Sequence, residues 1–262
     1  MIGASLHKPA LLPAELGRRM APFFAGGLRA LVVGGTTGIG HAVSTALAAA
    51  GVAVTATGIS ETEIASAPFE EGLSPAKAIL NVADQTSIDA VVNGMTRIDI
   101  AVNCAGYSVP RRAEFDPATF QHVIDINLTG ALRLANAVRP KMASKGGAIV
   151  NFCSFYSQFG SAYLPAYAAS KGGLLLLTKS LASAWVKEGI RVNAVAPGVI
   201  ATPMTTPLMK NEAATRELTT RVPIDRVGQP ADVAGSVLFL CSPAAAYVTG
   251  VMLPVDGGMV AA

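Results

Sequence analysis

Four side chains in the middle of the sequence are of types that can transfer a proton. Tyr167 and Lys171 are four residues apart, which is one turn of a helix, and Asn127 and Ser154 precede them. A phenol held beside an ammonium group can act as a general acid or base, and a serine hydroxyl can hold an oxygen on which charge develops. Such a set suits the interconversion of an alcohol and a carbonyl group. The plain alternative for the Tyr-x-x-x-Lys spacing is an exposed pair on a helix surface.

A glycine-rich segment far upstream would bind the phosphates of a dinucleotide. Residues 33–40 read Val-Gly-Gly-Thr-Thr-Gly-Ile-Gly and lie between an expected strand and an expected helix. Gly34 would allow a tight turn, Gly38 would let the backbone approach a pyrophosphate, and Gly40 would let helix and strand pack closely. The free N–H groups at the start of the helix would face the phosphates. The alternative is a flexible loop without a ligand.

Apolar runs that suit buried strands alternate with helical patterns along most of the chain. The expected strands are Leu28–Val33, Val52–Thr57, Ala76–Asn81, Ile98–Asn103, Ala148–Phe152, Arg191–Ala196 and Val251–Val255, and the expected helices are Ile39–Ala50, Asp84–Met95, Phe115–Lys141, Tyr163–Lys187 and Pro230–Leu240. This alternation predicts an α/β fold with one domain, a doubly wound (Rossmann) parallel sheet of about seven strands with helices on both faces.

Two segments lie outside this alternation. Residues 1–26 would be an N-terminal extension, which leaves residues 27–262 as the dinucleotide-binding catalytic domain. The stretch from Thr202 to Val222 is rich in threonine, proline and charge, and it would suit a mobile lid.

Composition narrows the class of protein. Hydrophobic residues make up 51% of the 262 residues and charged residues 14%, which suggests that some apolar surface is covered between subunits. The net charge of +3, without a long Lys/Arg stripe, does not indicate a nucleic-acid partner. We find no signal peptide and no apolar run near the roughly 20 residues that span a bilayer. The three cysteines are widely spaced and suit neither a metal site nor a disulfide framework. We therefore expect a cytoplasmic protein that binds no metal, no nucleic acid and no membrane.

The end of the second expected strand would contact the adenosine ribose. An acidic residue there favours NAD, and a nearby arginine favours NADP. Residues 57–60 read Thr-Gly-Ile-Ser and supply neither, although Gly58 would line the ribose. Without a carboxylate a 2′-phosphate is not repelled, and Thr37 and Ser60 would donate hydrogen bonds to it, so we favour NADP slightly over NAD. Glu61 would reverse this preference if it folded back onto the ribose.

The chain resembles the classical short-chain dehydrogenase/reductase family over about residues 28–259. The matching segments are Gly34-x-x-x-Gly38-x-Gly40, Asn103-Cys104-Ala105-Gly106, Asn127, Ser154, Tyr167-Ala168-Ala169-Ser170-Lys171, Pro197-Gly198 with Thr202, and Val255-Asp256-Gly257-Gly258. Two positions depart from the family pattern. Val33 stands where the family often has threonine, and Asn81 stands where it usually has an aspartate near the adenine.

The resemblance implies roles for the reactive set. Tyr167 would be the general acid for reduction and the general base for oxidation, with its pKa lowered by Lys171 and by the nicotinamide. Lys171 would also bind the nicotinamide ribose. Ser154 would hold the substrate oxygen, and Asn127 would fix a water that relays protons. The expected cofactor contacts, from the glycine turn and the resemblance together, are Gly34, Thr37, Gly38, Ile39, Gly40, Gly58, Ser60, Asn81, Val82, Asn103, Gly106, Tyr167, Lys171, Pro197, Gly198, Ile200 and Thr202.

We therefore expect an NAD(P)-dependent oxidoreductase that interconverts a secondary alcohol and a ketone. The resemblance also implies a homotetramer. A polyol, a sugar acid or a cyclic ketone would suit the aromatic loop of residues 155–164. A sugar acid gains support if Arg111 or Arg112 faces the cleft, although solvated arginines are the favoured alternative. Two other functions stay open. One is a 3-oxoacyl thioester (acyl carrier protein) reductase, and the other is a non-catalytic dinucleotide-binding regulator.

Overall fold

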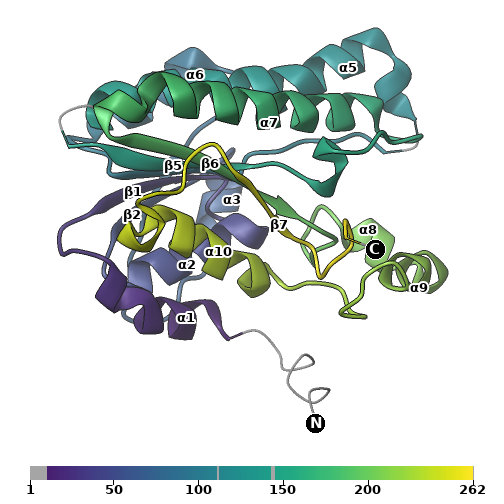
Figure 1. Cartoon of the computed structure of the whole chain (residues 1–262), viewed down its shortest axis with the longest axis horizontal. Coiled ribbons are helices and arrows are strands. Elements are labelled where there is room, and N and C mark those ends of the chain that lie inside the picture. Colours follow the sequence, from purple (N-terminus) through teal and green to yellow (C-terminus); the bar gives the residue numbers. More distant parts are fainter. Residues whose placement is uncertain (1–10, 111, 143–144, 262) are drawn as a thin grey trace.

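A single parallel sheet forms the centre of the molecule. The computed structural model describes residues 11–110, 112–142 and 145–261. Within them the sheet has seven strands in the order β3-β2-β1-β4-β5-β6-β7 (Figure 1). Its strands are β1 (Arg29–Val33), β2 (Ala53–Gly58), β3 (Ala76–Ile79), β4 (Ile100–Asn103), β5 (Gly147–Phe152), β6 (Ile190–Pro197) and β7 (Met252–Val255). The reversal of strand order between β1 and β4 is that of a doubly wound sheet, which confirms the predicted fold class.

Helices cover both faces of this sheet (Figure 1). On one face lie α5 (Pro117–Ile124), α6 (Gly130–Met142) and α7 (Pro165–Trp185), with α4 (Gln85–Gly94) against α6. On the other face lie α2 (Gly38–Ala49) and α10 (Pro230–Cys241), with α1 (Pro13–Met20) across both. The remaining helical segments are α3 (Glu61–Ala65), α8 (Thr206–Met209), α9 (Glu212–Thr219), and the short turns η1 (Ala21–Phe23), η2 (Ala113–Phe115), η3 (Asp125–Thr129), η4 (Phe155–Ser157), η5 (Val186–Glu188) and η6 (Pro243–Ala245).

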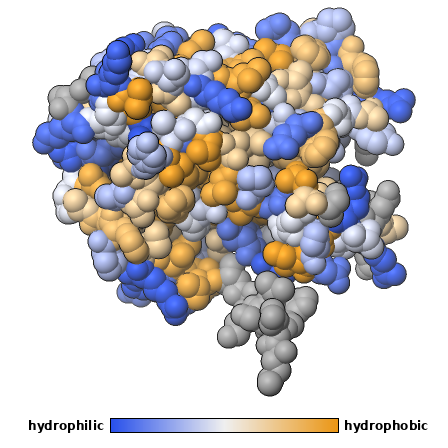
Figure 2. Space-filling model, viewed as in Figure 1, coloured by the Kyte–Doolittle hydropathy of each residue, from blue (hydrophilic) through white to orange (hydrophobic). Residues whose placement is uncertain are grey.

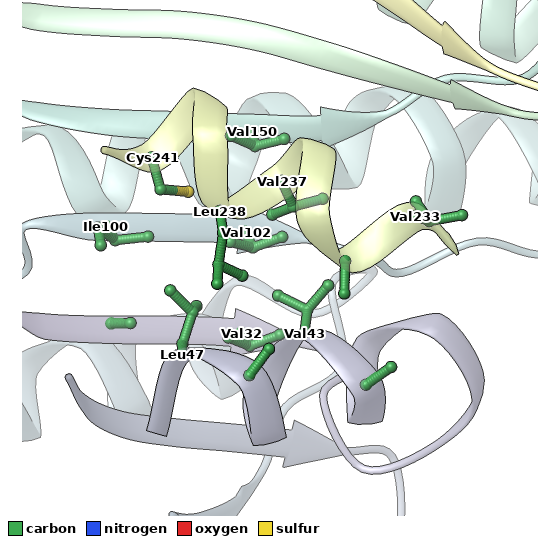
Figure 3. Close-up of a cluster of buried hydrophobic side chains, with 14 of the residues drawn as sticks. Val32, Val43, Leu47, Ile100, Val102, Val150, Val233, Val237, Leu238 and Cys241 are labelled. Atoms are coloured by element: carbon green, nitrogen blue, oxygen red, sulfur yellow. The ribbon is translucent and has the colours of Figure 1, made fainter. Parts of the chain in front are cut away.

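Each face of the sheet has its own apolar core. Figure 3 shows the core beneath α2 and α10, where Val32 and Val102 of neighbouring strands meet Leu47 and Leu238 of the two helices. On the opposite face, Leu31 and other strand residues pack against α4, α6 and α7. Because successive residues of a strand point to opposite faces, Leu31 and Val32 lie in different cores, and this explains why both faces of the central strands are largely apolar.

The predicted helix Phe115–Lys141 is not uniform. It comprises α5, the π-helical turn η3 and α6, in that order. A π turn inserts one residue into the helical spacing, and the apolar pattern on either side remains helical, so the sequence does not reveal it. The stretch from Thr202 to Val222 contains α8 and α9, and the sequence predicted neither of them. The short helices α1 and α3 were also missed.

Helix α1 packs closely on α2. A Cβ atom added to Gly17 would overlap the backbone carbonyl oxygen of Ala46 in α2, so only glycine allows this approach. Leu16 and Met20 of α1 pack against the core beneath α2 and α10. Helix α1 thereby covers part of that core.

Strand β7 forms one edge of the sheet and contains a proline. The backbone N–H groups of Ala194 and Gly198 donate to the carbonyl oxygens of Val251 and Val255. Residues of β7 alternate in direction, so the backbone of Pro254 faces away from β6. Proline has no N–H group, and an edge strand is the place in a sheet where this is tolerated.

Apolar and charged areas alternate on the face shown in Figure 2. Helix α7 and its flanks contribute large exposed apolar side chains, among them Tyr163, Leu176 and Val186. In the described part of the chain, no helix combines the length and the apolar character needed to cross a membrane.

Candidate active site

The predicted site residues gather at the carboxyl edge of the sheet. Gly34 follows β1, Asn103 ends β4, Ser154 follows β5 and Pro197 ends β6. These four strands are neighbours and run parallel, so their ends meet at one edge. Ligands of doubly wound folds bind at this edge, where the strand order reverses.

The glycine turn has the geometry of a phosphate site. Gly34 and Gly38 have positive φ angles of 69° and 53°. A Cβ atom on Gly40 would overlap the carbonyl oxygen of Gly34, so this glycine lets α2 start directly against the turn. Thr37 precedes α2 and makes no capping hydrogen bond to it. The first N–H groups of α2, including that of Ile39, therefore remain free to bind an anion.

Thr202, Gly106 and Asn103, three of the expected cofactor contacts, lie in the segments that follow β6 and β4 or at their ends. A Cβ on Gly38 would lie 3.4 Å from a methyl carbon of Thr202, so the segment after β6 crosses over the turn. A Cβ on Gly106 would lie 3.6 Å from the Lys171 Nζ atom. The Asn103 side chain is buried, and its oxygen accepts the Ala105 N–H at 3.3 Å, which fixes the turn after β4.

Three other expected cofactor contacts, Gly198, Ile200 and Asn81, are positioned by hydrogen bonds that involve the backbone. The Gly198 N–H donates to the Val255 carbonyl at 3.0 Å, and the buried Ile200 accepts the Thr205 hydroxyl at 2.5 Å. The Asn81 side chain accepts the Ala83 N–H at 3.0 Å and so shapes the turn before α4.

Val82 is buried beside Gly130, where a Cβ atom would lie 2.9 Å from the Val82 side chain. This contact places the start of α6 directly against the segment after β3.

Ser154, Tyr167 and Lys171 meet at this edge. The ammonium group of Lys171 lies 5.5 Å from the centre of the Tyr167 ring and donates to the Phe152 carbonyl at 2.6 Å. The Ser154 side chain is close enough to Tyr167 to lower the pKa of its phenol through a hydrogen bond, and the Ser154 oxygen also accepts the Tyr156 N–H at 3.3 Å. Pro165 at the start of α7 fixes the first turn, so Tyr167 and Lys171 point the same way, as residues four apart in a helix do.

Burial dominates the electrostatics of this set. It raises the pKa of the partly buried Tyr167 to about 12, and the hydrogen bond from Ser154 opposes the rise. Burial lowers the pKa of Lys171 to about 8, because the charged form loses water. Without a cofactor, burial thus outweighs the groups that favour the phenolate, and the expectation that Lys171 and a bound nicotinamide together lower the pKa of Tyr167 stays a prediction.

Asn127 lies in the π turn and links two other segments. Its oxygen accepts the Tyr107 N–H at 2.8 Å, and its amide nitrogen donates to the Tyr107 carbonyl at 2.8 Å and to the Ser170 hydroxyl at 3.0 Å. These bonds tie the loop after β4 to α7. Asn127 is thus buried, and both its side-chain oxygen and its amide nitrogen are hydrogen-bonded.

Glu114 is a buried site residue that the sequence analysis missed. Its carboxylate accepts the Val109 N–H at 2.9 Å and the Tyr167 N–H at 2.8 Å. It therefore caps α7 and holds the turn that carries Tyr167. Nothing in the sequence marks this role, because the residue it holds lies 53 positions away.

The end of β2 differs from the expectation. Ser60 accepts the Glu63 N–H at 3.2 Å and caps α3. Glu63, and not Glu61, folds back toward the glycine turn, where it accepts the Thr36 hydroxyl at 2.5 Å. The carboxylate of Glu63 thus lies beside Gly58, although the two residues directly after β2, Ile59 and Ser60, are not acidic.

The substrate side is less defined by polar contacts. The guanidinium of Arg112 lies 5.5 Å from the centre of the ring of Tyr163, which belongs to the aromatic loop of residues 155–164. Arg111 lies outside the described residues. Burial raises the pKa of the thiols of Cys104 and Cys153, so both remain protonated, as suits packing residues.

Comparisons with known proteins agree with this architecture. Residues 33–260 match a family model described as "Enoyl-(Acyl carrier protein) reductase". The chain is 38% identical to 2-dehydro-3-deoxy-D-gluconate 5-dehydrogenase of Bacillus subtilis (strain 168), over 88% of this chain and 94% of the relative. It is 39% identical to a 3-oxoacyl-[acyl-carrier-protein] reductase of Thermotoga maritima, over 88% and 96%.

A solved structure is similar over almost its full length. It is the crystal structure of a gluconate 5-dehydrogenase from Burkholderia cenocepacia J2315 in complex with NADP and tartrate, with a TM-score of 0.87 and 32% identity, over 93% of this chain and 99% of that one. The carboxyl edge of the sheet, its glycine turn and the extent of these matches lead to one conclusion: the chain belongs to the short-chain dehydrogenase/reductase family of NAD(P)-dependent oxidoreductases, which act on CH–OH and C=O groups.

Proposed function

We propose that Tyr167 exchanges the proton while the chain interconverts a secondary alcohol and a ketone. The observation that carries the proposal is the meeting of Ser154, Tyr167 and Lys171 at the carboxyl edge of the sheet. The Ser154 side chain interacts with that of Tyr167 and favours its phenolate, so the two side chains are neighbours and can act on one substrate oxygen.

The protonation state of Tyr167 suits ketone reduction directly. Its pKa of about 12 keeps the phenol protonated at neutral pH, ready to donate to the oxygen of a reduced carbonyl. In alcohol oxidation the phenolate must form, which needs positive charge nearby. A bound nicotinamide supplies or accepts the hydride, and its oxidised ring adds that positive charge. The ammonium group of Lys171 acts in the same direction.

Lys171 and Asn127 support Tyr167 in different ways. The buried ammonium of Lys171 faces Gly106, and we assign it to the nicotinamide ribose and to proton exchange with solvent. Asn127 uses its amide to hold Tyr107 and Ser170 in place, which supports a positioning role within the proton path.

The cofactor is NAD or NADP. The fit rests on the glycine turn, in which Gly34 and Gly38 have positive φ angles and Gly40 has no room for a Cβ atom, and on the free N–H groups at the start of α2. We propose that the turn and the strand ends hold the dinucleotide through Gly34, Thr37, Gly38, Ile39, Gly40, Gly58, Ser60, Asn81, Val82, Asn103, Gly106, Pro197, Gly198, Ile200 and Thr202, together with Tyr167 and Lys171.

A sugar acid is the substrate class that we favour. One relative is a 2-dehydro-3-deoxy-D-gluconate 5-dehydrogenase, and the solved relative is a gluconate 5-dehydrogenase in complex with tartrate. The exposed Arg112, held over Tyr163, offers a guanidinium on the predicted substrate side for a carboxylate. The second candidate is a 3-oxoacyl thioester, because one relative with that activity is 39% identical.

Initial rates test both candidates. We would follow the absorbance of the reduced nicotinamide as it is consumed by 5-ketogluconate or an acetoacetyl thioester, and as it forms from the oxidised coenzyme with 2-dehydro-3-deoxygluconate. The proposal expects the sugar acids to react faster by at least tenfold. A faster thioester would move the assignment to the second candidate.

A pair of tyrosine variants tests the reaction itself. Tyr167→Phe should lower kcat by at least a hundredfold, since general acid catalysis contributes about 10²–10⁴-fold. Tyr247→Phe is the matched control, because that side chain is fully exposed, and it should keep its activity. Equal turnover of Tyr167→Phe and the unchanged chain would refute the proposed role and favour a non-catalytic dinucleotide-binding protein.

We also propose a cytoplasmic homotetramer in which residues 27–262 form the catalytic domain and residues 1–26 an extension. Exposed apolar side chains support the assembly: Leu132 on α6 is 37% exposed, and Leu176 on α7 is 64% exposed. Sedimentation as a monomer at micromolar concentration would refute the tetramer.

A further inference from the structure

A carboxylate lies at the point where the glycine turn meets the end of β2. Glu63, in α3, turns back so that its Oε1 atom accepts the hydroxyl of Thr36 at 2.5 Å. Its Oε2 atom lies 3.5 Å from the backbone nitrogen of Ile59, directly after β2. Thr36 itself is buried, and its hydroxyl also lies 3.3 Å from the Thr57 carbonyl. The two carboxylate oxygens are therefore directed at two segments that are 23 residues apart in the sequence.

The local sequence is built around this placement. A Cβ atom on Gly58 would lie 2.7 Å from the Thr36 hydroxyl and 2.8 Å from the Glu63 Oε1 atom, so only glycine leaves room for the pair. Ser60 caps α3 by accepting the Glu63 N–H at 3.2 Å, which orients the helix that carries the carboxylate. Gly58, Ser60 and Thr36 thus all help to position the Glu63 carboxylate.

The charge of Glu63 is not neutralised locally. Within the part of the chain that the structure describes, no lysine, arginine or histidine forms an ion pair with it. The neighbouring Ile59 is 72% exposed and brings no charge. A carboxylate accepts hydrogen bonds and donates none, so it favours hydroxyl groups as partners and disfavours phosphate.

We propose that Glu63 selects between the two coenzymes by accepting the adenosine ribose hydroxyls and repelling a 2′-phosphate, so that the chain binds NAD(H) more tightly than NADP(H). This rests on the proposed dinucleotide site, because the ribose must lie beyond β2. The acid comes from α3, five residues beyond the last residue of β2, and it is held there by Thr36.

Direct binding tests the proposal without using turnover. Dissociation constants for NADH and NADPH are measured by coenzyme fluorescence for the unchanged chain, for Glu63→Gln and for Glu61→Gln. Glu61→Gln is the matched control, because it removes the same charge from the exposed side of the same short helix. We expect the unchanged chain to prefer NADH, and Glu63→Gln to tighten NADPH binding by about tenfold while NADH changes by less than about threefold. Glu61→Gln should leave the ratio unchanged.

A second variant guards against a failure of Glu63→Gln to fold. Thr36→Val keeps the shape of the side chain but removes the donor that holds the carboxylate, so it should shift the ratio in the same direction by a smaller factor. Tight binding of both coenzymes with a ratio that neither variant changes would overturn the role of Glu63 alone. Binding of neither coenzyme to the unchanged chain would overturn the dinucleotide site, and the selection with it.

Discussion

Replacement of Lys171 by methionine should stabilise the coenzyme-free protein at neutral pH. The ammonium group is almost completely buried, and burial lowers the pKa of Lys171 from 10.5 to about 8. In the unfolded chain the amine takes up a proton below pH 10.5, whereas in the folded chain it does so only below about pH 8. The unfolded state therefore binds more protons in this window, so the free energy of unfolding rises with pH there. Below pH 8 the full destabilisation by the buried charge is present.

The magnitude follows from the pKa difference. One pKa unit corresponds to about 1.4 kcal/mol, so the buried ammonium destabilises the fold by about 3 kcal/mol at pH 7 and by less than about 1 kcal/mol at pH 10. Methionine removes this charge and keeps the stem, but it also removes the hydrogen bond to the Phe152 carbonyl. That loss costs about 1–2 kcal/mol at any pH. Lys171→Met should therefore gain about 1–2 kcal/mol at pH 7 and lose that advantage by pH 10.

Urea unfolding at pH 7 and at pH 10 measures this difference. Lys179→Met is the control, because Lys179 is exposed on the same helix and its ammonium stays in water. The control should change stability by less than about 0.5 kcal/mol at both pH values. If Lys171→Met were less stable than the unchanged chain at pH 7, or if its effect were the same at both pH values, the account of the buried ammonium would be wrong.

Three further substitutions have outcomes that the packing predicts. Glu114→Ala removes the acceptor of two backbone N–H groups, that of Tyr167 among them, and should cost about 3 kcal/mol, seen as a Tm about 10 °C lower by calorimetry. Gly40→Ala introduces a Cβ atom where the Gly34 carbonyl oxygen lies, so it should weaken coenzyme binding at least tenfold by fluorescence titration. Gly17→Ala should lift α1 from α2, and limited proteolysis should then cleave the N-terminal helix faster than in the unchanged chain.

The strands and the reactive set were accessible from the sequence for different reasons. All seven expected strands overlap a strand of the sheet. The central strands are largely apolar because they are buried on both faces, whereas β3 and β7 at the two edges are more exposed. Tyr167 and Lys171 lie on one helix, so their spacing alone places them together. The turn at Gly34, Gly38 and Gly40 is equally local.

The features that were missed depend on contacts between distant residues. Glu114 gains its place from a backbone N–H group 53 positions away, and Glu63 gains its place from a threonine 27 positions earlier. Glu61 follows β2 more closely in the sequence, but the direction of α3 decides that the carboxylate of Glu63 folds back. The π turn around Asn127 was invisible because it changes backbone hydrogen bonding without changing the apolar pattern.

The proline in β7 limits how the sheet can grow. A further strand laid beside β7 would find no hydrogen-bond donor at Pro254, in a strand of only four residues, Met252–Val255. Another polypeptide cannot readily continue the ladder at this edge, which protects the protein against edge-to-edge aggregation. If two copies of the chain associate at the β7 edge, the contacts are made by side chains, and the two sheets do not merge into one.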